Sequence, residues 1–149
     1  MHPLRTMGIV VAVVLGGAQL VRLPATNPPV RGDLIAPPEV KGSLRRGCYD
    51  CHSNETTWPW YSAVAPVAWI IRGDVNEGRR RLNFSDWADY ESDPETAAQK
   101  LRQIAKSVGN GDMAPMYYRA LHAGARLTPA QREAVRHWAE QEAVSHQPH

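Results

Sequence analysis

The sequence predicts an all-α domain of about four short helices joined by long loops. Apolar residues recur at helical spacing in four separate segments, whereas the alternation typical of strands is scarce. The 12 prolines and 11 glycines favour irregular connections around a helical core over a strand-rich sandwich. A length of 149 residues allows one compact domain with additional ends.

Three parts are predicted along the chain. Residues 1–23 carry a basic start and then an uncharged apolar run over 7–21, which is typical of segments that direct export. No small-residue cleavage site follows, so we expect residues 1–23 to remain as a membrane helix. A cleaved signal peptide stays an alternative, because the run is shorter than the roughly 20 residues that span a bilayer. Residues 24–38 are expected to form an extended, proline-rich linker, and residues 39–146 the functional domain.

The first two helices of this domain are predicted over 38–48 and 66–80. In the first, Val40, Leu44 and Cys48 recur at helical spacing, so the helix delivers Cys48 at its C-terminal end. In the second, apolar positions are expected to share one face, namely Val67, Ile70, Ile71, Val75 and Gly78.

The last two helices are marked by capping residues. Asp93 is a candidate N-cap and Pro94 suits the first helical position of a helix that continues to Val108. The final helix opens with a capping-box pattern, in which Thr128 precedes Gln131 by three residues.

Charge and cysteine content restrict the function. With 17 Lys and Arg against 15 Asp and Glu, the net charge of +2 is too even to predict a nucleic-acid surface. The two cysteines, Cys48 and Cys51, lie three positions apart, so neither can link distant parts of the fold.

Cys48, Cys51 and His52 form a Cys-x-x-Cys-His motif. Two thiols at this spacing reach the two vinyl groups of a haem, and the imidazole that follows ligates the iron. A thioredoxin-like redox pair would need a βαβ context, and a structural zinc site would need a second ligand pair; the sequence offers neither. The motif therefore predicts one covalent haem c, with His52 as an iron ligand.

Met113 is the first candidate for the second axial ligand of the iron. Cytochromes of this kind commonly take a methionine thioether from a loop well after the motif, and Met113 lies in a glycine-rich turn. A core methionine that fills a gap is the structural alternative. Met116 is the reserve candidate, and His122 would give a bis-histidine haem.

Two further clusters each have two interpretations. The aromatic stretch 58–61, with Trp69, forms either the walls of a haem pocket or simply the core. The arginine run 79–81 either binds haem propionates or a partner, or is a solvated helix end favoured by the helix dipole.

Four stretches of the sequence carry a family resemblance: 48–61, 65–67, 76–79 and 82–87. They closely resemble the bacterial haem-binding domain family often called Haem_bd, and the resemblance runs from Thr26 to the end of the fourth helix. Members look like small exported proteins with an N-terminal membrane segment and one Cys-x-x-Cys-His site. The resemblance implies a c-type cytochrome-like fold, thioether attachment at Cys48 and Cys51, and iron ligation at His52.

One departure from the family pattern concerns the second iron ligand. Members commonly show a Gly-Glu-Met-Pro-like stretch where this chain has Gly-Asp-Met-Ala-Pro at 111–115. The alanine between methionine and proline brings Met116 into play beside Met113.

The expected function is one-electron transfer at the outer face of the cytoplasmic membrane. The N-terminal helix would be a single-pass anchor, with the haem domain on the periplasmic or extracytoplasmic side and a separate redox partner protein. The alternative is a haem-based sensor or ligand-binding module with an open or labile distal position. No paired carboxylates, distal Arg and His pair or second haem motif are visible, so an enzyme is not expected.

Overall fold

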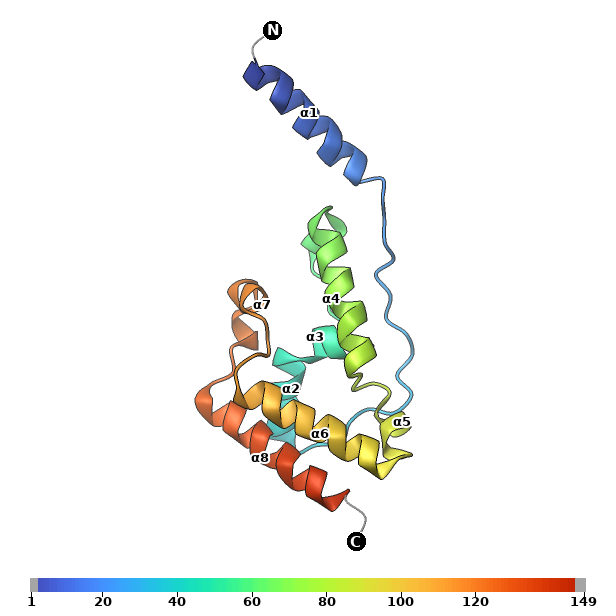
Figure 1. Ribbon diagram of the computed structural model, residues 1–149, viewed down its shortest axis with the longest axis vertical. Coiled ribbons are helices and arrows are strands. Elements are labelled where there is room, and N and C mark those ends of the chain that lie inside the picture. Colours follow the sequence, from blue (N-terminus) through green and yellow to red (C-terminus); the bar gives the residue numbers. More distant parts are fainter. Residues whose placement is uncertain (1–2, 147–149) are drawn as a thin grey trace.

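The computed structural model describes residues 3–146, in which the regular elements are all helices or 3₁₀ turns (Figure 1). The elements in chain order are α1 (Pro3–Ala18), α2 (Pro38–Gly47), α3 (Tyr49–His52), the 3₁₀ turn η1 (Trp60–Ala63), α4 (Val67–Arg81), α5 (Trp87–Glu91), α6 (Pro94–Gly109), α7 (Met116–Leu121), the 3₁₀ turn η2 (Ala123–Ala125) and α8 (Pro129–Ser145). Over residues 3–146 there is no strand, only an isolated parallel bridge between Gly32 and Asp86. The all-α prediction is confirmed. The expected number of four domain helices is too small, because α3, α5 and α7 were not predicted.

The core lies among α2, α6 and α8, at the end of the molecule away from α1 (Figure 1). α6 and α8 pack along each other, α2 packs on α8, and α5 covers one end of α6. The buried side chains of this cluster include Leu44, Tyr49, Phe84, Trp87, Leu101, Ile104, Val108 and Val135. The cluster reaches from α8 to Tyr49 inside the cysteine motif, so the core directly supports the candidate site.

The predicted caps of the last two helices have different outcomes. At α8 the capping box forms: Gln131 N–H donates to Thr128 Oγ1 at 3.2 Å, and Thr128 N–H donates to Gln131 Oε1 at 2.9 Å. At α6, Asp93 occupies the N-cap position, but its carboxylate accepts from Thr96 Oγ1 at 2.6 Å instead of from a backbone N–H. Pro94 opens α6 as expected.

The capping box yields a stability prediction. Thr128→Ala removes the acceptor of the Gln131 N–H and is expected to lower the free energy of unfolding by about 1 kcal/mol. Thr128→Ser keeps a hydroxyl in place and should unfold like the wild type in a urea titration. An equal loss in both variants would show that the threonine methyl group matters and the cap does not.

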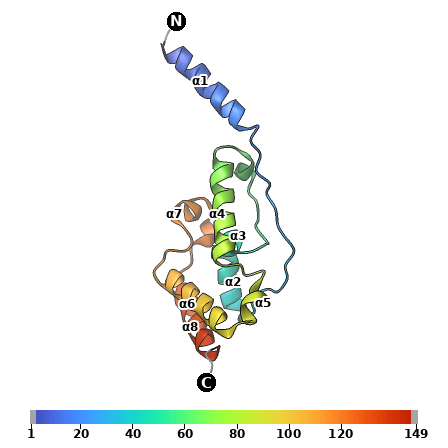
Figure 2. The same ribbon diagram turned by 45° about the vertical axis from the view of Figure 1, so that its right-hand side comes forward.

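The segment 24–38 is extended, as its prolines predict, but it is more than a spacer. It runs along the side of the domain towards α5 (Figure 2). Arg31 N–H and Gly32 N–H both donate to Ser85 O, Leu34 N–H donates to Phe84 O, and the Leu34 side chain is buried in the core. The segment is therefore a strap that belongs to the folded domain.

The apolar face predicted for the second helix is only partly correct. In α4, Val75 and Gly78 are buried as expected, whereas Val67 and Ile70 are exposed. Arg72 takes the inward position in the first half of the helix and donates to Ser62 O at 3.1 Å. Apolar periodicity therefore predicts the inward-facing residues in the second half of α4 but not in its first half.

α1 projects away from the other helices (Figure 2), and none of its residues is buried. Its 16 residues make a helix about 24 Å long, against roughly 30 Å for the hydrocarbon core of a bilayer. Within the described part of the chain, no helix has both the length and the apolar character needed to cross a membrane. The structure thus gives no support for the membrane helix predicted over 1–23, of which residues 1 and 2 lie outside the described range.

Candidate functional site

The cysteine motif folds into a tight turn between α2 and α3. Cys48 caps the C-terminus of α2, with its N–H donating to Leu44 O at 2.8 Å. The next turn follows at once, since His52 N–H donates to Cys48 O at 2.9 Å. Cys51 and His52 therefore lie within one helical turn of Cys48, as the prediction of a shared site requires.

The His52 ring is held by the end of α4. Its Nδ1 lies 3.0 Å from Gly78 O and 3.1 Å from Leu82 O, so Nδ1 carries the proton and donates it to carbonyl oxygens. Burial lowers the pKa of His52, against the opposing effect of the two carbonyls. The ring is therefore neutral at pH 7 with an unprotonated Nε2, and Nε2 makes no hydrogen bond to any residue of 3–146.

Gly78 lets α4 approach the motif closely. A Cβ atom built at this position would lie 2.3 Å from Cys51 O and 3.0 Å from Cys51 C, closer than side-chain atoms tolerate. Because those atoms belong to the backbone of α3, they cannot rotate aside. The absence of a side chain at residue 78 is what allows Gly78 O to reach His52.

Cys48 and Cys51 are free, partly buried thiols. Burial, with a smaller effect of Cys51, raises the pKa of Cys48 to about 12. Burial, followed by the negative charges of Asp50 and Asp74, raises the pKa of Cys51 to about 11. Both groups are therefore protonated thiols at neutral pH.

Two cavities meet at the motif and share the side chains of Cys48, His52, Arg81 and Met113. The first, of about 160 Å³, continues between α3, α4 and α7 along Cys51, Asp74, Gly78, Tyr117 and Tyr118. The second, of about 420 Å³, continues along α6 past Leu82, Phe84, Lys100, Ile104 and Val108. Concave, mainly apolar surfaces with a few converging polar groups are typical of cofactor sites.

The three candidates for the second iron ligand are placed very differently. Met113 is half-buried and lines both cavities that contain His52. Met116 is 78% exposed and lines neither. His122 accepts a hydrogen bond at Nε2 from Tyr61 (3.0 Å) and its ring stacks on Tyr118, away from His52. His122 instead lines a third, apolar cavity of about 280 Å³ together with Cys51. Of the three candidates, only Met113 lines a cavity together with His52.

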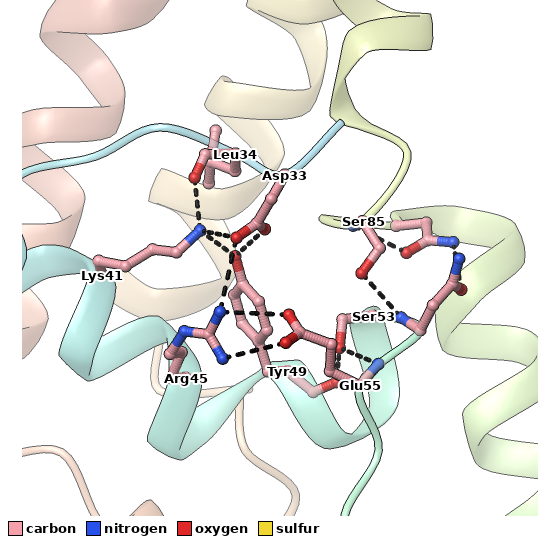
Figure 3. A network of polar contacts seen from close by, with 10 residues as sticks. Asp33, Leu34, Lys41, Arg45, Tyr49, Ser53, Glu55 and Ser85 are labelled. Carbon is pink, nitrogen blue, oxygen red and sulfur yellow. Dashed lines mark hydrogen bonds and ion pairs between the residues drawn. The ribbon is translucent and has the colours of Figure 1, made fainter. Parts of the chain in front are cut away.

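A polar network anchors the motif to α2 and to the strap (Figure 3). Tyr49, the residue between Cys48 and Asp50, stacks on Phe84 with ring centroids 4.9 Å apart. Its hydroxyl donates to Asp33 Oδ1 at 2.6 Å, and Lys41 pairs with the same carboxylate at 2.7 Å. The strap, α2 and α3 are thereby tied together around one phenol ring.

The other predicted clusters contribute less than expected. Of the aromatic residues in 58–61 and Trp69, none lines the two cavities at His52, but Tyr61 lines the third cavity together with Cys51. Trp60 is 81% exposed and belongs to neither pocket wall nor core. The arginine run 79–81 divides: Arg79 donates to Ser53 O at 2.7 Å, whereas Arg80 and Arg81 both pair with Glu77. Arg81 also lines both cavities.

Sequence reasoning missed several residues of the site. The acceptors for His52 are the backbone carbonyls of Gly78 and Leu82, which no residue type reveals. Phe84 and Lys100 also went unnoticed, although the family-like stretch 82–87 contains Phe84.

The side chains around the two cavities fit a covalently held haem. Two free thiols border the space into which His52 can present Nε2, and the thioether of Met113 lies beside it. Lys100 and Arg81, the latter paired with Glu77, place basic side chains at the second cavity, which suits the propionate carboxylates.

Comparison with known proteins agrees with this geometry. A family model described as a haem-binding domain (Haem_bd) matches residues 13–141, which is most of the chain and includes every residue of the candidate site. No curated protein and no solved structure matches the chain significantly. The resemblance seen in the sequence is thus confirmed, and with it haem binding. The chain belongs to the haem-binding domain family.

Proposed function

We propose that the chain holds one haem c, attached through Cys48 and Cys51, with His52 and Met113 as the axial ligands of the iron. The orientation of His52 is the observation that carries this proposal. Two backbone carbonyls hold Nδ1 at 3.0 and 3.1 Å, which leaves Nε2 as the coordinating atom beside both thiols. Ligating histidines are commonly oriented in this way, through a hydrogen bond from the other ring nitrogen.

The proposed activity is one-electron transfer, without enzymatic turnover. A haem iron with histidine and methionine ligands supplies reversible exchange of a single electron. The residues of the chain bind and orient: Gly78 and Leu82 hold His52, and Met113 supplies a thioether. Ile104 and Val108 give the second cavity an apolar wall.

We further propose that α1 directs the chain out of the cytoplasm and keeps it at the outer face of the cytoplasmic membrane. The supporting observation is that α1 is apolar yet buries no residue against the rest of the chain, with valines from Val10 to Val14 exposed. Covalent haem attachment also belongs outside the cytoplasm. Cell fractionation tests this: haem-stained chain should sediment with membranes and be digested by protease added to spheroplasts.

The second candidate function is a haem-based sensor or ligand-binding module. It is favoured by the position of Met113 in the irregular turn between α6 and α7, beside Gly111 with its positive φ of 74°. A ligand held by such a turn is easier to displace than one on a helix.

The absorption spectrum of the holoprotein, made with a haem c maturation system, separates the two functions. Electron transfer through an iron with both axial positions occupied predicts sharp bands in the reduced spectrum, a weak sulfur-to-iron charge-transfer band and no spectral change with carbon monoxide. A high-spin spectrum that shifts with carbon monoxide would instead establish the sensor or ligand-binding module.

Met113→Ala tests the second axial ligand. Because Met113 lines both cavities at His52, its loss should leave one axial position of the iron without a protein ligand. We then expect the charge-transfer band to disappear, carbon monoxide to bind and the reduction potential to fall. Met116→Ala is the matched control, since the exposed Met116 side chain should leave all three readouts unchanged. The reverse pattern would transfer the assignment to Met116.

A further inference from the structure

Large apolar side chains are exposed together at the end of the domain where α4 begins. Trp60 is 81% exposed and Ile70 60%, with Val64 and Val67 beside them. Leu121 of α7 is 67% exposed and lines the third, apolar cavity with Val67, Ile70 and Cys51, so α7 adjoins the same surface and this surface continues into the candidate site. We name these five residues the apolar end. Soluble monomers rarely leave so many large apolar side chains clustered in water.

The first half of α4 is inverted at this surface. Val67 and Ile70 are exposed at the mouth of the third cavity, while Arg72 is buried and donates to Ser62 O. Within residues 3–146, Arg72 Nε has no hydrogen-bond partner at all. A helix in water places its charged side chain outside and its aliphatic ones inside. The exposed aliphatic side chains at the start of α4 therefore fit an apolar environment outside the domain.

The end of α1 is attached to this surface. Gln19, just after α1, donates from Nε2 to Ala65 O at 3.1 Å and accepts from Ala65 N–H at 3.0 Å. Trp69 Nε1 donates to Val21 O at 3.0 Å. α1 accordingly leaves the molecule beyond the start of α4 (Figure 2). The two apolar surfaces that the rest of the chain leaves uncovered are thus neighbours.

We propose that the apolar end rests on a lipid membrane. This inference rests on the proposed role of α1, because a helix held at the membrane and hydrogen-bonded to Ala65 brings the start of α4 to the lipid boundary. Tryptophan rings favour that boundary, which suits Trp60. Arg22, directly after the apolar run, supplies a positive charge for anionic headgroups. The domain is then held at the membrane both by α1 and by the apolar end, which fixes its orientation.

Spin labelling of the full-length holoprotein tests the contact. One cysteine is introduced by Ile70→Cys and, in a matched control, by Ala134→Cys at an exposed position of α8, in the helix pair away from α1. Each chain is labelled with a nitroxide and bound to vesicles of phosphatidylethanolamine and phosphatidylglycerol. Wild-type chain given the same reagent measures any reaction at Cys48 and Cys51. Val64→Cys is a second probe, and an unchanged haem spectrum verifies each fold.

The expected result is a label at Ile70 that collides several-fold more with oxygen than with a water-soluble nickel chelate, and a label at Ala134 with the opposite preference. Equal exposure to water at both positions, on chains that sediment with the vesicles, would overturn the lipid contact while α1 still anchors the chain; the apolar end would then face a protein partner. Chains that do not sediment would overturn the anchoring by α1 and, with it, this proposal.

Discussion

The double variant Cys48→Ala and Cys51→Ala is expected to carry no covalently attached haem. Both proposed thioether bonds are lost, and the chain offers no other cysteine to replace them. Denaturing electrophoresis with haem staining, together with the mass of the intact chain, measures the result. Wild-type chain should stain and carry the mass of one haem; the variant should do neither.

The single variants are the controls for this experiment. Cys48→Ala and Cys51→Ala each keep one thiol at the cavity, so each should retain haem through one bond, at reduced yield. Haem that stains in the double variant would mean attachment elsewhere in the chain. Wild-type chain that loses its haem on denaturation would show non-covalent binding and contradict the assignment of haem c.

Gly78→Ala is expected to lower the free energy of unfolding of the holoprotein by roughly 1–3 kcal/mol, the usual cost of overpacking. The new methyl group would lie 2.3 Å from Cys51 O, so α3 and α4 must separate. Their separation also lengthens the hydrogen bond between His52 Nδ1 and Gly78 O. Urea unfolding should therefore shift to lower concentration, together with a change in the haem spectrum.

Gly73→Ala on the same helix is the matched control. An added Cβ there meets no atom within 4 Å, and alanine is the better helix former by about 1 kcal/mol. This variant should unfold at higher urea concentration with an unchanged spectrum. If both variants were stabilised equally, the close crossing of α3 and α4 would not determine the geometry at His52.

The four long helices of the domain, α2, α4, α6 and α8, were predictable because their sequence signals are local. Proline at the first helical position marks α6 and α8, and apolar periodicity gives α2 and α4 to within about a residue of their bounds. The short helices α3, α5 and α7 span four to six residues, too few for a period to appear. Their existence depends on packing against the longer elements.

The candidate site was predictable only where side-chain chemistry defines it. The pair of thiols and His52 follow from the motif, and the glycine-rich turn indicated Met113. The carbonyls of Gly78 and Leu82 and the strap that pairs with Phe84 and Ser85 act through the backbone, which every residue type shares. Sequence patterns cannot identify such partners.

The continuity of α4 has a geometric consequence. The helix presents Ile70 in its first half and delivers the carbonyl of Gly78 to His52 in its second, eight residues later, without a break between them. At 1.5 Å per residue, this interval corresponds to about 12 Å along the axis. The number of residues between Ile70 and Gly78 therefore sets the distance along the axis of α4 between the exposed apolar end and the His52 ring. Inserting one helical turn between Ile70 and Asp74 would increase that distance without altering any residue of the site.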